Sequence, residues 1–334
     1  MHGAGIERMI NYLRIGSILL FFNYYLHIYD LRAIRRLTVF SLICIVFVII
    51  STLRGLALDP MAARLLATGR EDMMQGLTGM MIGSYGFIYG LVFVTVAILG
   101  LIKSSLIKKQ TIILFVIAAL AIYTIFSAAF MIALLILATA LVLLLLNIKK
   151  ISWTLVVASI SFMVIHIFSP IFYDVLMYLG DIVEHVVLSH RFHSLAFLIQ
   201  HGSVDGSENM AVRWEVLQLS IETFLNNPIL GIGGFYGFGT RQYGIGGHSA
   251  FFDELAKYGI LGAGFLFVAL YSNARFVYRR LKNNKQKMVY YSCMSVFFIL
   301  GVINTLLFVP LLFMAYFVVP GIILSFYKAD LVSK

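Results

Sequence analysis

Nine long apolar runs constrain the fold of this chain more than any other feature, because each is long enough to cross a bilayer. A transmembrane helix needs about 20 apolar residues to span roughly 30 Å of hydrocarbon. The runs lie at about residues 10–28, 38–57, 81–102, 111–127, 129–147, 153–171, 250–272, 289–307 and 311–327. The sequence therefore predicts an all-α polytopic membrane protein with about nine transmembrane helices. The first run is the weakest, because Arg14 and Asn23 lie inside it.

The composition agrees with burial in lipid and excludes several other classes of protein. The chain has 334 residues, of which 61% are hydrophobic and 12% are charged, whereas a soluble domain is about half apolar and a quarter charged. Its two cysteines, Cys44 and Cys293, both lie inside apolar runs. Neither has histidine or cysteine neighbours at zinc-ligand spacing, so we expect no disulfide framework and no thiolate metal site.

The basic residues indicate which links between the runs face the cytoplasm. They gather in alternate links, and cytoplasmic loops carry the excess of lysine and arginine in membrane proteins. These links hold Arg32, Arg35, Arg36, Lys103, Lys108, Lys109, Lys149, Lys150, Arg275, Arg279, Arg280, Lys282, Lys285 and Lys287. The net charge of +10 is therefore a topology signal, and no nucleic-acid partner is expected.

Two larger links then face outward, at about residues 58–80 and 172–248. The second is a single large periplasmic loop, which divides the chain into N-terminal transmembrane helices (1–171), the loop (172–248) and C-terminal transmembrane helices (249–334). The loop holds seven acidic residues, three arginines and no lysine. Guanidinium groups suit bidentate binding of phosphate or carboxylate. The alternative is that these arginines pair with the neighbouring acids on a wet surface.

The last third of this loop contains a helix followed by many glycines. Apolar residues recur at helical spacing from Asn209 and predict an amphipathic helix with Arg213 in its first turn. Pro228 ends that helix, because proline disfavours helical geometry at the residue before it. The glycine-rich stretch 231–247 has neither a G-x-G-x-x-G nor a P-loop pattern, which excludes a nucleotide fold. We interpret it as a flexible lid or saddle over a site, with a loosely ordered surface loop as the alternative.

A histidine precedes the next apolar run. His248 would lie at the outer N-terminal end of a transmembrane helix, where the helix dipole favours a neutral imidazole that can accept a proton from a hydroxyl. Asp253 and Glu254 follow one turn inside, a costly place for charge unless it is paired or functional. Both are candidate substrate-binding residues. Helical spacing also allows either carboxylate to pair with Lys257, which would make it structural.

Together these elements resemble the Wzy/WaaL superfamily of O-antigen polymerases and ligases. The resemblance rests on an arginine-bearing helix, an N-P-x-x-G-x-G turn, and a histidine that opens the next span before an acid and a glycine. Here these elements are Arg213, Asn227–Gly233, His248, Asp253 or Glu254, and Gly259. The specific part covers about residues 209–262, and the rest of the chain matches only in architecture.

The resemblance implies glycosyl transfer at the outer face of the bacterial inner membrane. The donor would be a glycan on undecaprenyl pyrophosphate and the acceptor another repeat unit, so the leading hypothesis is a surface-polysaccharide polymerase. It would be a metal-independent, inverting glycosyltransferase without a cofactor. Arg213 would hold the donor pyrophosphate, and His248 would activate or orient the acceptor hydroxyl. A chain-length regulator protein is a further candidate partner.

One departure from the family bears on the choice between polymerase and ligase. Ligases often carry a Ser-Arg pair where the central spans meet, and this chain has Ser127-Ala128-Ala129-Phe130 there. A second phosphate-binding arginine is then expected elsewhere, with Arg70, Arg191 and Arg241 as candidates. The missing pair favours a polymerase.

The residues leave two alternative functions open. An O-antigen ligase would transfer the glycan to lipid A–core, and a flippase would carry the lipid-linked glycan across the membrane. Transporters show internal repeats and interrupted helices with charges at the midplane. This sequence has no repeat, and its charges cluster at the outer surface, which favours an enzyme over a transporter.

Two smaller features are interpreted structurally. The histidines at 185, 190 and 193 are close in sequence, but their spacing suits no common zinc motif. The pairs Gly79/Gly83 and Gly86/Gly90 predict close packing between helices of the bundle.

Overall fold

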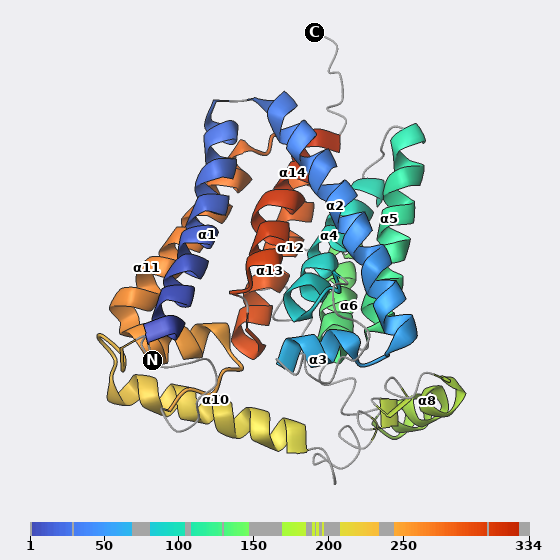
Figure 1. Ribbon diagram of the computed structural model, residues 1–334. Helices are drawn as coiled ribbons and strands as arrows, with labels where there is room; N and C mark the ends of the chain where they lie inside the picture. Colours follow the sequence, from blue (N-terminus) through green and yellow to red (C-terminus); the bar gives the residue numbers. More distant parts are fainter. Residues whose placement is uncertain are drawn as a thin grey trace.

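The protein is a helical bundle in the computed structural model (Figure 1). The structure describes residues 2–28, 30–68, 81–103, 108–128, 130–146, 169–184, 189–190, 192–193, 196, 208–233, 244–305 and 307–326. Its elements are α1 (His2–His27), α2 (Leu31–Leu58), α3 (Ala62–Thr68), α4 (Tyr85–Lys103), α5 (Lys108–Ser127), α6 (Met131–Leu145), α8 (Ser169–Ile182), α10 (Glu208–Asn226), α11 (Ala250–Arg280), α12 (Asn284–Ile303), α13 (Val309–Phe313), the π-helix η3 (Met314–Val318) and α14 (Val319–Phe326). No strand occurs within these ranges, which confirms the predicted all-α class.

Among the described residues, four stretches of helix are long and apolar enough to cross a membrane. They are α2, α4, α11 and the continuous unit Val309–Phe326 formed by α13, η3 and α14. Shorter apolar helices at Ile112–Ser127 and Ile132–Leu145 coincide with two more predicted runs, and α1 and α12 coincide with the runs at 10–28 and 289–307. The chain is thus a multi-pass membrane protein. The full number of nine spans stays a prediction, because the run at 153–171 lies mostly outside the described residues.

Helix α4 forms the centre of the bundle. Its side chains are buried from Gly86 to Ile98, and it packs against α5, α6, α12 and α13. A Cβ on Gly86 would lie 2.6 Å from Phe308 Cβ, and one on Gly90 would collide with Met314. The predicted close packing at Gly86/Gly90 is therefore confirmed, because only glycine lets the final helical unit approach α4 this closely.

The outer helices present large apolar side chains away from the bundle. Phe40 and Phe47 on α2 and Phe265 on α11 are all more than half exposed. A soluble protein rarely leaves so many such residues uncovered, whereas in a bilayer they contact the lipid chains. These helices therefore form the lipid-facing wall of the bundle.

The two ends of the bundle differ in what they carry. The α1–α2 and α11–α12 links lie at the upper end in Figure 1, and α3, α10 and the start of α11 lie at the lower end. Two of the four predicted basic links, α1–α2 and α11–α12, thus lie at the upper end, whereas residues 104–107 and 147–150 of the other two lie outside the described residues. At the end of α4, Lys103 Nζ donates to the Leu144 carbonyl at the end of α6 (2.6 Å). The described parts of the predicted outward segments thus meet at one end of the molecule, opposite the α1–α2 and α11–α12 links.

Candidate active site

The N-P-I-L-G-I-G turn is docked on a break in α11. The helix is interrupted at Gly259, whose φ of 62° and ψ of −171° are not helical. Three backbone hydrogen bonds join turn and helix there: Ile232 N–H to the Ala256 carbonyl (3.0 Å), Ile260 N–H to the Pro228 carbonyl (2.8 Å) and Leu261 N–H to the Ile229 carbonyl (3.2 Å). The turn therefore replaces hydrogen bonds that the interrupted helix leaves unmade.

Glycine is needed on both sides of this junction. A Cβ on Gly231 would collide with the backbone carbonyl group of Lys257, and a Cβ on Gly259 would collide with the carbonyl of Ile229. Both glycines also have positive φ, 64° and 62° respectively, a conformation that costs other residues energy. The glycine of the N-P-I-L-G-I-G turn and the glycine inside α11 are thus both needed for the close contact between the backbones of the turn and the helix.

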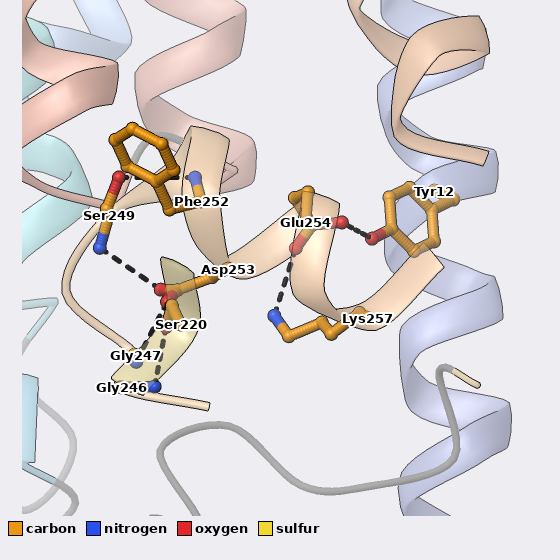
Figure 2. Close-up of polar contacts among 9 residues, drawn as sticks. All are labelled: Tyr12, Ser220, Gly246, Gly247, Ser249, Phe252, Asp253, Glu254 and Lys257. Atoms are coloured by element: carbon orange, nitrogen blue, oxygen red, sulfur yellow. Dashed lines mark hydrogen bonds and ion pairs between the residues drawn. The ribbon is translucent and has the colours of Figure 1, made fainter. Parts of the chain in front are cut away.

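The segment that leads into His248 is held by Asp253 (Figure 2). Its Oδ1 accepts hydrogen bonds from Ser220 Oγ (2.6 Å) and Gly247 N–H (3.2 Å), and its Oδ2 accepts one from Ser249 N–H (3.1 Å). Only 2% of Asp253 is exposed, and these bonds offset the cost of burying a carboxylate. One side chain thus ties α10 to the start of α11 and to the loop between them.

The loop before His248 lies directly on α10. Gly246 N–H donates to Ser220 Oγ (2.8 Å), and a Cβ at Gly246 would collide with the Val216 carbonyl. Ile245 is fully buried. This part of the glycine-rich stretch is therefore packed, which differs from the flexible lid or loose surface loop expected from its composition. Residues 234–243 of the stretch lie outside the described residues.

His248 itself is half-buried and immediately precedes the N-cap of α11. The N-cap Ser249 accepts a hydrogen bond from Phe252 N–H (3.3 Å), and Ala250 N–H donates to the Asn304 carbonyl at the end of α12 (3.0 Å). The predicted place of His248 at the start of an apolar helix is confirmed. Its catalytic role stays a prediction.

Glu254 belongs to a second buried network that reaches α1. It accepts a hydrogen bond from Tyr12 Oη (2.6 Å) and pairs with Lys257 Nζ (3.0 Å), as Figure 2 shows. Glu254 and Lys257 are 2% and 3% exposed. The pairing of a carboxylate with Lys257, one of the two interpretations open from the sequence, therefore holds for Glu254. Since Asp253 bonds Ser220 instead, both acids have internal partners, and their substrate-binding role stays a prediction.

The candidate arginines are described only in part. Arg213 lies in the second turn of α10, one turn later than expected because the helix begins at Glu208. The side chain of Arg213, and Arg70, Arg191 and Arg241 altogether, lie outside the described residues.

A different arginine, which sequence reasoning missed, lies near the same end of the bundle. Arg64 on α3 places its guanidinium 5.2 Å from the centre of the Phe130 ring. Phe130 in turn contacts the Tyr89 ring (6.1 Å between centroids), and Asn304 Nδ2 donates to Tyr89 Oη (3.3 Å). Arg64 is thus connected through three contacts to Asn304, which bonds the start of α11 beside His248. The sequence feature that could have identified Arg64 is its place in the outward link 58–80, where only Arg70 was considered.

The histidine group of the large loop offers no described metal site. His193 Nε2 lies 3.1 Å from Asp181 Oδ1, and His185 lies outside the described residues. No cluster of three or more His, Cys, Asp or Glu suited to a metal ion occurs in the part of the chain that the structure describes.

The geometry agrees with a comparison to known families. The family model Wzy_C, described as O-antigen ligase, matches residues 113–267. This match supports the resemblance to the Wzy/WaaL superfamily that the sequence motifs carry. The Wzy/WaaL match runs from α5 into α11, and it includes Arg213, the N-P-I-L-G-I-G turn, His248 and the break at Gly259. No curated protein matches the chain.

Proposed function

We propose that the chain is a surface-polysaccharide polymerase that works at the periplasmic face of the bacterial inner membrane. It would transfer a glycan from undecaprenyl pyrophosphate to an acceptor repeat unit. The observation that carries the proposal is the fixed position of His248, which lies between a loop docked on α10 and the capped start of α11. A general base must be held within hydrogen-bond reach of the proton that it removes.

The proposed reaction is an inverting displacement at the donor sugar. The acceptor hydroxyl oxygen attacks the anomeric carbon on the face opposite the pyrophosphate, and His248 takes the hydroxyl proton. The bond from that carbon to the pyrophosphate oxygen breaks, and its electron pair leaves with undecaprenyl pyrophosphate. Arg213 stabilises the charge that grows on this leaving group.

The spacing along α10 supports this pairing of roles. Position 213 precedes Ser220 by two helical turns, and residues at that spacing share a face of a helix. Ser220 hydrogen-bonds the loop leading into His248. The helix that bears Arg213 is therefore fixed to the segment that bears His248, as a shared site requires.

Arg64 fits the same proposal as a source of positive charge at the α5–α6 turn. That turn lacks the arginine that ligases often carry, and the guanidinium of Arg64 lies over Phe130 in the same turn. We add Arg64 to Arg70, Arg191 and Arg241 as a candidate second phosphate-binding residue.

Complementation of a polymerase-deficient strain tests the proposal. Wild type should restore long surface-glycan ladders, and Arg213→Ala and His248→Ala should give single-repeat glycan at normal protein levels. His190→Ala, an exposed histidine of the same outward loop, serves as the matched control and should restore the ladder. Full ladders with both Arg213→Ala and His248→Ala would refute the site.

A ligase is the second candidate, because the matching family model is described as O-antigen ligase. A ligase-deficient strain separates the two functions. It accumulates polymerised carrier-linked glycan, and the return of glycan to lipid A–core when the wild type is expressed identifies a ligase. Unpolymerised substrate left on the cytoplasmic face identifies a flippase. The break in α11 is a feature shared with transporters, but it lies near the start of the helix, beside the candidate site.

A further inference from the structure

The N-P-I-L-G-I-G turn docks on α11 through its backbone, and its large apolar side chains stay uncovered. Ile229 is 64% exposed and Leu230 is 70% exposed. Both lie beside the break in α11, where the Ile229 carbonyl accepts from Leu261 N–H (3.2 Å). The docking hydrogen bonds use backbone atoms, so polar side chains at these two positions would leave them intact. The contact with α11 therefore does not explain why the two side chains are apolar.

These side chains belong to a larger surface, here called the apolar edge. It consists of five apolar side chains that are each at least half exposed: Leu225, Ile229, Leu230, Ile260 and Leu261. Hydrogen bonds join its two halves, because Ile260 N–H and Leu261 N–H donate to carbonyls of the turn. Leu225 adds the last turn of α10, which leads directly into the docked turn. No Asp, Glu, Lys or Arg occurs from residue 223 to residue 240. A continuous, uncharged surface of this kind marks an interaction site.

The apolar edge continues into the lipid-facing wall of the bundle. Phe265 and Val268 are both more than half exposed, and they follow Leu261 at the spacing that puts residues on one face of a helix. Phe265 already belongs to the wall that contacts lipid chains. Because the apolar edge has no boundary with that wall, the same apolar solvent, the bilayer, is expected to cover both.

The length of α11 supports the same conclusion. Beyond the break at Gly259, the uncharged part of the helix runs from Ile260 to Ala274 and ends at Arg275. At 1.5 Å per residue this part is about 22 Å long, which is short of the roughly 30 Å of hydrocarbon in a bilayer. The basic residues from Arg275 onward belong at the level of the lipid headgroups. The missing length therefore lies at the other end of this part, where the apolar edge lies.

We propose that the apolar edge is inserted into the leaflet at this end of the bundle, with Ile229 and Leu230 among the lipid acyl chains. Interfacial segments bury their apolar side chains about 5–10 Å into the boundary between headgroups and acyl chains. Asn226 and Asn227, which are exposed just before the turn, then lie at the level of the headgroups. Part of the segment 172–248 thus enters the membrane again. The proposal does not rest on glycan transfer, because it concerns the depth of these residues and not their activity.

Spin labels on the full-length protein, in vesicles of phosphatidylglycerol and phosphatidylethanolamine, measure this depth. In a background without Cys44 and Cys293, a single cysteine replaces Leu230, Phe265 or Glu222 and carries a nitroxide. Phe265→Cys is the reference in the lipid-facing wall, and Glu222→Cys, exposed on α10, is the reference in water. Power saturation compares collisions with oxygen, which dissolves in hydrocarbon, and collisions with a polar nickel chelate, which stays in water.

The ratio of oxygen to nickel collisions at position 230 should be several-fold higher than at position 222 and should approach the ratio at position 265. Ile229→Cys should give the same result. Both side chains are exposed, so neither cysteine should change the unfolding temperature in detergent. A ratio at position 230 equal to that at position 222 would show that the apolar edge faces water and would overturn the proposal. Exclusion of both reagents would also overturn it, because a second copy of the chain or another protein would then cover the edge.

Discussion

At the scale of single residues, the position of His248 depends on a hydroxyl of the preceding helix, α10. Ser220 Oγ donates to Asp253 and accepts from Gly246 N–H, and Ser220 is fully buried. Ser220→Ala should leave both the carboxylate and the amide short of a partner, at a cost of about 1–3 kcal/mol in the free energy of unfolding. Thermal unfolding in detergent measures this, and glycan polymerisation should fall with it.

Ser17→Ala is the matched control for that substitution. Ser17 is exposed on α1 and bonds only the carbonyl one turn earlier in its own helix, so its loss should change the unfolding temperature little. If Ser220→Ala and Ser17→Ala unfold at the same temperature, the bridge from α10 to Asp253 does not hold the site.

Arg64 gives a second prediction at this scale. If its guanidinium stabilises the leaving pyrophosphate, Arg64→Gln should lower polymerisation about a hundredfold, as loss of one transition-state donor does, with normal protein levels. Arg54→Gln is the control, because Arg54 is exposed on α2. Surface-glycan ladders compare the two. A normal ladder with Arg64→Gln would contradict this role and leave Arg64 as a residue that only packs against Phe130.

Sequence spacing predicted some of these contacts and missed others for a clear reason. Glu254 and Lys257 are three residues apart on one helix, so their pairing was among the predicted alternatives. Asp253 and Ser220 are 33 residues apart on different helices, and no local pattern indicates which hydroxyl a carboxylate will meet. Arg64 was missed because the link 58–80 was considered as a loop, whereas α3 places this arginine over a ring of another turn.

At the scale of elements, the N-P-I-L-G-I-G turn after α10 interlocks with the break in α11. The sequence predicted the end of α10 at Pro228, because proline acts on its direct neighbour. It did not predict the break at Gly259, since one glycine inside an apolar helical run only weakens a helix. The break forms because the turn supplies replacement hydrogen bonds, and that partner is distant in the sequence.

Gly259→Ala tests this interlock. Alanine would adopt a backbone conformation that is almost restricted to glycine, at a cost of about 1–3 kcal/mol, and its Cβ would also collide with the Ile229 carbonyl. The unfolding temperature in detergent should fall and glycan polymerisation should be lost. Gly264→Ala, on the same helix with nothing within 4 Å of the added Cβ, should be neutral or slightly stabilising. Similar unfolding temperatures for the two variants would contradict the role of the break.

At the scale of the whole molecule, charge and hydropathy predicted most of the architecture, whereas they predicted few contacts of the candidate site. The all-α class and the long apolar helices are present, and the two basic links that the structure describes, α1–α2 and α11–α12, lie at one end. These features depend on properties summed over many residues, which tolerate local errors. The packing of residues 244–247 on α10 depends instead on single atoms, such as the room that Gly246 leaves for the Val216 carbonyl, and composition alone indicated a loose loop.

The orientation of the bundle is the prediction on which the proposed function depends most. Lysine and arginine bias places the α11–α12 turn in the cytoplasm and α10 outside. In a background without Cys44 and Cys293, a cysteine in place of Glu222, exposed on α10, should react with a membrane-impermeant maleimide in cells whose outer membrane is permeabilised. A cysteine in place of Lys285, exposed at the opposite end, should react only after the inner membrane is disrupted. The reverse pattern would put His248 on the side where nucleotide-sugar donors are available, and a lipid-pyrophosphate donor would no longer be required.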